Sequence, residues 1–321
     1  MQPSSESRIP GRTMSNDQNE SKIAVLIPCY NEEITIGKVI EDFRQELPTA
    51  EIYVFDNNSS DRSAEIAREK QAIVIKETRQ GKGYVIASMF KKIDADLYIM
   101  VDGDDTYPAE SVHELIQPIL DDEADMAVGS RLSKYKKKAF KPLNLFGNRL
   151  IVTLVNWIFD SRLTDIMSGY RAFNRDFVKN IPLISKGFEV ETQLVIQSLH
   201  YQYRIVEIDI ELRKRPPGSE SKLNTFSDGF KVILTILNIA KAYRPLFFFG
   251  MSGLLIFLLG LGLGAIPIIE FIETGLISHF PTAILATGLV LVSTILFAVG
   301  FILDTINFRI KEIIQIMRKQ T

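Results

Sequence analysis

Two carboxylates placed two residues apart, Asp102 and Asp104, are the side chains of this sequence best suited to chemistry. They follow the apolar run 97–101, whose composition predicts a buried β-strand. Aspartates at positions i and i+2 just past a strand end can converge on one hard divalent cation, which can in turn bridge phosphate oxygens. The pattern therefore predicts a Mg2+ or Mn2+ site with Asp102 and Asp104 as its ligands.

The segments around this pair predict the scaffold that holds it. Short β-rich runs at 23–27, 52–55, 73–75, 97–101 and 126–128 alternate with helical patterns at 34–46, 62–70, 84–93 and 111–120. This alternation predicts an α/β fold with a mostly parallel sheet and helices on both faces. Ligands of such sheets bind at the carboxyl ends of the strands. The segments at those ends, 28–32, 56–61, 81–83, 102–104 and 129–131, all carry polar, charged or glycine residues, so we expect one site there.

The C-terminal part of the chain has a different character. Two uncharged apolar stretches, 245–269 and 280–303, are each long enough to cross a bilayer, which takes about 20 residues. Lysines and arginines flank the pair on its outer sides, and the loop 270–279 has none, which predicts that both chain ends and the body lie in the cytoplasm of an integral plasma-membrane protein. A predicted helix at 145–159, which contains the only tryptophan, either packs into the core or lies on the lipid surface.

Composition excludes several classes of function. The net charge of −2 argues against a nucleic-acid-binding protein. A single cysteine, Cys29, rules out an intrachain disulfide and a cysteine-based zinc site. The three histidines are scattered along the sequence, which argues against a zinc enzyme. We expect a disordered leader at 1–21, in which Met14 could be the natural start, a catalytic domain at 22–222, an amphipathic juxtamembrane helix at 223–244, a transmembrane hairpin at 245–306 and a basic cytoplasmic tail at 307–321.

Four short motifs follow one another in the first third of the sequence. They are Pro28-x-Tyr30-Asn31-Glu32, the segment 56–61, Gly81-Lys82-Gly83 and Asp102-x-Asp104. In this combination they resemble the inverting family 2 glycosyltransferases, which have a GT-A fold. The segments 168–171 and 218–223 narrow the resemblance to the polyprenyl-phosphate glycosyltransferases, which include dolichol-phosphate mannose synthase and bacterial undecaprenyl-phosphate glucosyltransferases of the GtrB type. The resemblance extends from about residue 22 to the C-terminus.

The resemblance implies a binding site for a nucleotide-sugar donor. The metal held by Asp102 and Asp104 would neutralise the leaving diphosphate. The resemblance implies that Asp104 ligates the metal directly, and that Asp102 either contacts the ribose or reaches the metal through water. The residues implied in donor binding are Pro28, Tyr30, Asn31, Glu32, Asp56, Asn57, Lys82, Gly83, Asp102, Gly103 and Arg131. The family often has an aspartate where this chain has Asn57, so the nucleobase stays open. Asp61 is either part of this site or a helix cap, and we interpret Asp105 as a turn or cap residue.

The implied acceptor is a lipid phosphate. The residues predicted to hold it are Arg149, Arg213, Arg215, Ser221 and Lys222, among which the resemblance favours Arg215 and Lys222 over Arg213.

The resemblance implies Asp104 and Asp165 as catalytic residues, with Asp165 in the position often proposed as the base. A phosphate monoester has a second pKa near 6 and needs little deprotonation, so an orienting role for Asp165 stays open beside that of base. Glu189 and Glu191 are weaker candidates, either for contacts to sugar hydroxyls or as partners of a helix dipole.

These features predict a glycosyltransferase that moves one sugar onto a polyprenyl phosphate. UDP-glucose and undecaprenyl phosphate are the favoured substrates, and GDP-mannose is the alternative donor. A processive polysaccharide synthase fits less well because the chain lacks a Q-x-x-R-W motif and has only two predicted spans. An inactive membrane scaffold is the non-enzymatic alternative. Glycines at 250, 253, 260 and 264 permit helix packing within the chain or between the chains of a homo-oligomer.

Overall fold

The computed structural model describes residues 21–131, 142–183, 187, 189–216, 234, 237–238, 240–318. Within them, one seven-stranded sheet has the order β3-β2-β1-β4-β6-β5-β7. The strands are β1 (Ile23–Cys29), β2 (Glu51–Asp56), β3 (Ile73–Lys76), β4 (Leu97–Met100), β5 (Met126–Ser130), β6 (Arg171–Asn174) and β7 (Ile205–Asp209). All pairings are parallel except those of β6, which runs antiparallel to both β4 and β5. The predicted mixed, mostly parallel sheet is confirmed.

Helices cover both faces of this sheet. They are α1 (Ile36–Glu46), α2 (Ser63–Glu69), α3 (Lys82–Lys92), the 3-10 turn η1 (Ala109–Ser111), α4 (Val112–Leu120), α5 (Pro142–Phe159), α6 (Arg175–Asn180) and α7 (Val190–His200). Alternate residues of β1 face two separate apolar cores: Ala24 and Leu26 pack with α3, α6 and α7, whereas Val25 and Ile27 pack with α1 and α4. The period-2 alternation of strand side chains is the reason that a continuous apolar strand serves both layers.

The sequence did not predict strand β6. It is four residues long and begins with Arg171, which is fully buried, so its charge interrupts the apolar pattern by which a strand is recognised. Its insertion between β4 and β5 brings the preceding residues 168–170 beside the end of β4. The D-x-D segment therefore has a neighbour that only the sheet topology supplies.

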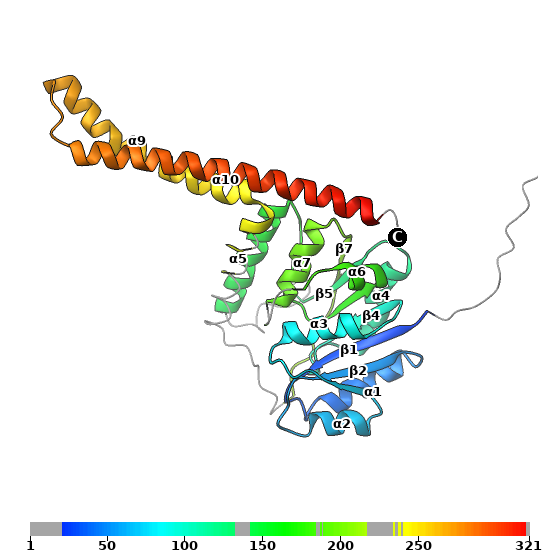
Figure 1. Cartoon of the computed structure of the whole chain (residues 1–321). Helices are drawn as coiled ribbons and strands as arrows, with labels where there is room; N and C mark the ends of the chain where they lie inside the picture. Colours follow the sequence, from blue (N-terminus) through cyan, green and yellow to red (C-terminus); the bar gives the residue numbers. More distant parts are fainter. Residues whose placement is uncertain are drawn as a thin grey trace, which may run out of the picture.

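Two long apolar helices, α9 (Pro245–Thr274) and α10 (Phe280–Arg318), form a hairpin that extends away from the α/β body (Figure 1). Their most hydrophobic windows are only 11% and 17% buried, so they do not resemble core helices of a soluble protein and are candidate membrane spans. Helix α10 continues without a break through the predicted tail to Arg318.

Glycines hold the two hairpin helices close together. A Cβ atom on Gly260 would lie 3.1 Å from the Leu289 Cβ, and one on Gly253 would lie 3.2 Å from the Ser293 carbonyl oxygen. These glycines thus serve helix packing within the chain. At the base of the hairpin, the ring of Trp157 at the end of α5 meets that of Phe247 edge-on, with centroids 4.4 Å apart, and so connects the body to α9.

Candidate active site

The Asp102 side chain lies just past β4 and is held from one side by a mostly buried lysine. The Lys82 ammonium, at the first residue of α3, lies 2.6 Å from Asp102 Oδ1 and 2.5 Å from Glu191 Oε1 on α7. Burial by itself would lower the pKa of Lys82, but attraction to the two carboxylates outweighs burial and raises that pKa. The predicted donor residues Lys82 and Asp102 are therefore in direct contact.

Gly169 borders the same carboxylate from another side. A Cβ atom at Gly169 would lie 2.2 Å from Asp102 Oδ2 and 2.6 Å from its Cγ. The backbone N–H of Gly169 donates to the Tyr107 hydroxyl at 3.0 Å, which fixes the close approach of the two segments. The site thus requires a residue without a side chain at position 169, a requirement that the sequence motif contained but did not explain.

The second carboxylate, Asp104, is almost fully buried. Its Oδ1 accepts hydrogen bonds from the Thr106 backbone N–H at 3.1 Å and from the Thr106 hydroxyl at 2.5 Å. Its Oδ2 is ion-paired with Arg215. The loop is tied to α1 by the hydroxyl of Thr35, which donates to the Gly103 carbonyl at 2.6 Å. Each D-x-D carboxylate is therefore paired with a cation drawn from another part of the domain.

The residues present fit a hard divalent cation. Asp102 and Asp104 offer carboxylate oxygens at one strand end, and the described part of the chain contains no cluster of three or more acidic, histidine or cysteine side chains that could hold a metal. A cation here would rely on one or two carboxylates plus phosphate and water oxygens, which is the usual coordination of Mg2+ at phosphate sites.

Asn57, where the family often has aspartate, fastens the loop that leads to Lys82. Its Nδ2 donates to the carbonyls of Glu77 and Arg79, at 3.0 and 2.8 Å, and its Oδ1 accepts from the Gly81 N–H at 2.8 Å. A carboxylate could not donate to the two carbonyls. These contacts give a structural reason for an amide at position 57. Asp56, also buried, is the last residue of β2 and accepts a hydrogen bond from the Ser59 backbone N–H.

The segment after β1 packs against the segment after β2. The Asn31 N–H donates to the Ser59 hydroxyl at 3.0 Å, and the Glu32 N–H donates to the Ser63 hydroxyl at 2.7 Å. Asn31 has a φ of 52°, a left-handed conformation that asparagine tolerates better than most residues. Pro28 lies in β1, Gly83 in the first turn of α3, and the Tyr30 side chain is exposed beside them. These predicted donor residues thus gather at the carboxyl edge of β1 to β4.

The guanidinium of Arg131, whose side chain is mostly buried, forms a two-pronged ion pair with the buried carboxylate of Asp165. The guanidinium Nε and Nη2 atoms lie 2.6 and 2.9 Å from the two Asp165 carboxylate oxygens, and the Arg131 backbone N–H donates to the same group at 3.1 Å. Burial alone would raise the pKa of Asp165, but the neighbouring guanidinium outweighs it, so the pKa lies below its ordinary value. Asp165 is therefore a fixed anion and a weak proton acceptor.

The predicted acceptor residues have different surroundings. Arg213 is held by carboxylates: its Nη1 lies 2.7 Å from Asp42 and 3.2 Å from Asp105, and its Nη2 lies 2.6 Å from Glu110. Arg215, two residues later, reaches Asp104 instead. The Arg149 residue is exposed on α5, and Ser221 and Lys222 lie outside the described residues.

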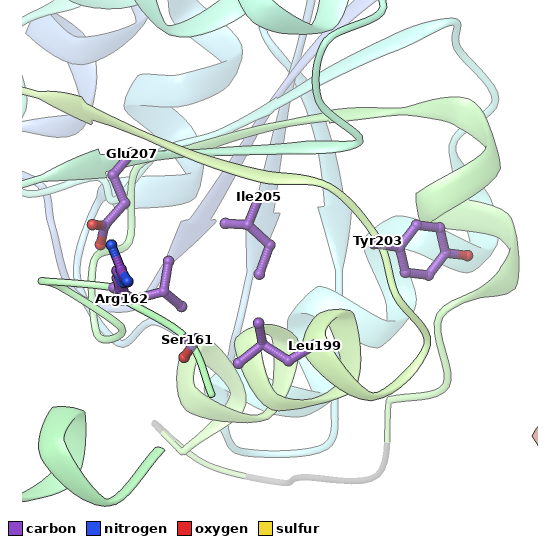
Figure 2. A pocket seen from close by; sticks show the side chains of 7 residues that line it. Ser161, Arg162, Leu199, Tyr203, Ile205 and Glu207 are labelled. Atoms are coloured by element: carbon purple, nitrogen blue, oxygen red, sulfur yellow. The ribbon is translucent and has the colours of Figure 1, made fainter. Parts of the chain in front are cut away.

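Glu207 is a site-forming residue that the sequence analysis missed. Its carboxylate accepts from the Thr164 and Asp165 backbone N–H groups, at 2.8 Å each, and so fixes the segment that carries Asp165. It also lines a cavity of about 340 Å³ that contains none of the predicted donor or acceptor residues (Figure 2). The other lining residues are Ser161, Arg162, Leu163, Leu199, Tyr203 and Ile205. No sequence signal pointed to Glu207, because its partners are backbone groups distant in the chain.

Comparison with known proteins agrees with this geometry. The model of the family described as "Glycosyl transferase family 2" matches residues 24–181. Glycosyltransferase AglJ of Haloferax volcanii is 32% identical over 285 residues, which cover 88% of this chain and 93% of that protein. The chain belongs to glycosyl transferase family 2. The resemblance drawn from the motifs is confirmed, and the protein is a glycosyltransferase.

One further relative and one solved structure are similar to this family 2 enzyme. A dolichyl-phosphate hexose transferase of Haloferax volcanii is 29% identical over 222 residues, covering 69% of this chain and 95% of that protein. The glucosyl-3-phosphoglycerate synthase of Mycobacterium tuberculosis, in a crystal structure with Mn2+, UDP and glucosyl-3-phosphoglycerate, shares 20% identity at a TM-score of 0.59 over 68% of this chain and 80% of that one. The structural likeness supports the GT-A fold.

Proposed function

We propose that this glycosyltransferase moves one sugar from a nucleotide-sugar donor to a polyprenyl phosphate, with UDP-glucose and undecaprenyl phosphate as the favoured substrates. The observation that carries the acceptor class is the pair of apolar helices, mostly unburied, attached to the α/β body through Trp157 and Phe247. The dolichyl-phosphate hexose transferase relative supports the same class.

The donor would bind at the carboxyl edge of β1 to β4. Asp102 and Asp104 would hold Mg2+ or Mn2+, which when bound offsets the charge of the leaving diphosphate. Asp56 and the segment 28–32 would surround the nucleoside. Lys82, next to Gly83, would reach a phosphate or the edge of the base. The presence of Mn2+ and UDP in the crystal structure of the mycobacterial synthase supports dependence on a divalent cation.

The reaction we propose is an in-line displacement at the anomeric carbon by an oxygen of the lipid phosphate. An α-linked donor would then give a β-linked product. A phosphate monoester is mostly dianionic at neutral pH, so it requires no strong base. Because Arg131 already neutralises Asp165, we propose that Asp165 orients Arg131 toward the phosphates rather than accepting a proton.

The acceptor phosphate would lie between the body and the membrane. Arg149, Arg215, Ser221 and Lys222 are the proposed contacts, whereas three carboxylates engage Arg213 and favour a structural role for it. The distribution of basic residues supports a plasma-membrane protein whose catalytic domain, residues 22–222, and both chain ends face the cytoplasm, and a homo-oligomer remains part of the proposal.

The proposal is tested by transfer of radiolabelled sugar into an organic-extractable lipid. Purified protein is incubated with undecaprenyl or dolichyl phosphate, Mg2+ or Mn2+, and a panel of UDP- and GDP-sugars. We expect label from UDP-glucose that disappears with EDTA and falls at least about 100-fold in Asp104→Asn. Glu46→Gln, which removes a surface carboxylate paired with His113, is the matched control.

The outcome also separates the alternatives. Label from GDP-mannose alone would replace the favoured donor with the alternative one. An absence of label from every donor, with an active control enzyme in parallel, would favour the inactive scaffold. If Asp104→Asn transferred sugar as fast as wild type, the proposed role of the Asp102 and Asp104 carboxylates in holding the metal would be refuted.

A further inference from the structure

A chain of mostly buried charges links helix α7 to the D-x-D segment. Glu191 lies in the first turn of α7, and its side chain is only 6% exposed. Its carboxylate lies 2.5 Å from the Lys82 ammonium, which lies 2.6 Å from Asp102 Oδ1 on the far side. One mostly buried cation is thus shared between a buried carboxylate, that of Glu191, and a partly exposed one, that of Asp102.

Helix α7 is itself fixed at this point. The fully buried guanidinium of Arg171 donates to the Glu191 carbonyl at 3.0 Å and to the carbonyls of Ile166 and Ser168 at 2.9 Å each. Residue 168 directly precedes Gly169, whose missing side chain makes room for Asp102. The two groups that border Asp102, the Lys82 ammonium and the Gly169 backbone, are therefore both anchored near Glu191.

We propose that Glu191 is a positioning residue of the donor site, which acts through Lys82 on Asp102. By sharing the ammonium, Glu191 holds it at one side of Asp102 and leaves that carboxylate with part of its negative charge. Without Glu191 the ammonium would pair more fully with Asp102 and compete with a divalent cation. The inference rests on the proposed metal-diphosphate site.

This role differs from a direct contact with the sugar. The Glu191 carboxylate is engaged by Lys82, and the whole residue is only 4% exposed. A group that supports a metal ligand from behind typically changes metal affinity by roughly 10- to 100-fold when it is removed. A residue that contacted only the sugar would leave metal binding unchanged when no sugar is present.

The test measures the binding of Mn2+ to the purified full-length protein in detergent. Binding is detected by electron paramagnetic resonance, once with saturating UDP and once with saturating GDP. We expect Glu191→Gln, which keeps the shape of the side chain, to weaken Mn2+ binding roughly 10- to 100-fold. The control is Glu41→Gln on α1, since Glu41 has the same 2.5 Å contact with a lysine, Lys70, but is exposed. It should bind Mn2+ as wild type does.

A double-mutant cycle separates this role from a general loss of structure. In a Lys82→Met background, Glu191→Gln should cause no further loss of Mn2+ affinity, because the intermediary is gone. An equal loss in both backgrounds would overturn the proposal, as would wild-type Mn2+ affinity in Glu191→Gln. If the wild-type protein failed to bind Mn2+ both with UDP and with GDP, the proposed donor site would be refuted, and the inference that rests on it would be refuted too.

Discussion

Substitution of Gly169 by alanine tests the geometry of the D-x-D segment most directly. The new Cβ would lie 2.2 Å from Asp102 Oδ2, so reaching an ordinary contact of 3.4 Å requires a displacement of about 1.2 Å. The φ angle of Gly169 is not in the left-handed region, so the added methyl acts through space and not through backbone strain. Asp102 is 27% exposed and can move toward solvent, which keeps the cost to folding small.

A misplacement of about 1 Å in a catalytic group can cost about 100-fold in rate. We therefore expect Gly169→Ala to lower kcat/KM for sugar transfer about 100-fold, equivalent to about 2.7 kcal/mol. The assay measures initial rates of label transfer over a range of donor concentrations, with Mn2+ affinity measured in parallel. The melting temperature should stay within a few degrees of that of wild type.

The matched control is Gly262→Ala, since a Cβ at Gly262 would meet no atom within 4 Å. This variant should retain wild-type transfer. If Gly169→Ala transferred sugar at a rate within about threefold of wild type, the close approach of Gly169 to Asp102 would not determine the position of the carboxylate, and the reasoning would be refuted.

Two further predictions concern buried charges. Asp165→Ala leaves the Arg131 guanidinium without its partner and should lower the free energy of unfolding by about 3–5 kcal/mol. This loss should appear as a melting temperature lower by roughly 10 °C. The double variant Asp165→Leu, Arg131→Met should recover most of the lost stability. Hydrogen bonding from Arg79 lowers the pKa of Glu77 from 4.5 to about 2, so Glu77 contributes stability above pH 4.5 that is lost as the pH falls toward 2. Melting temperatures over that range should decline less steeply in Glu77→Gln, and an unchanged slope would contradict the assignment.

Much of the fold could be predicted from the sequence because its signals are local. Apolar runs of three to five residues between helical patterns identified β1 to β5, and the length of the apolar stretches identified α9 and α10. The missed strand, β6, is short and begins with a buried charge, and its stability comes from neighbours on both sides of the sheet. The four residues of β6 by themselves contain no signal that predicts these neighbours in the sheet.

The candidate site divides in the same way. The sequence by itself determined which chemistry was available: a D-x-D pair after a strand, polar residues after four other strands, and a membrane-length hairpin. Because the carboxyl ends of parallel strands share one edge of a sheet, this information sufficed to predict that these residues lie at one edge of the sheet.

Only the tertiary structure decided how the charged side chains pair. Lys82 and Arg131 were both predicted to meet the donor, yet each lies against a carboxylate, Glu191 and Asp165 respectively, contributed by a segment distant in the chain. Such pairs form where the fold removes water and two opposite charges lie within reach of each other. Their partners depend on the crossing of β6 and the packing of α7, which no local pattern of residues specifies.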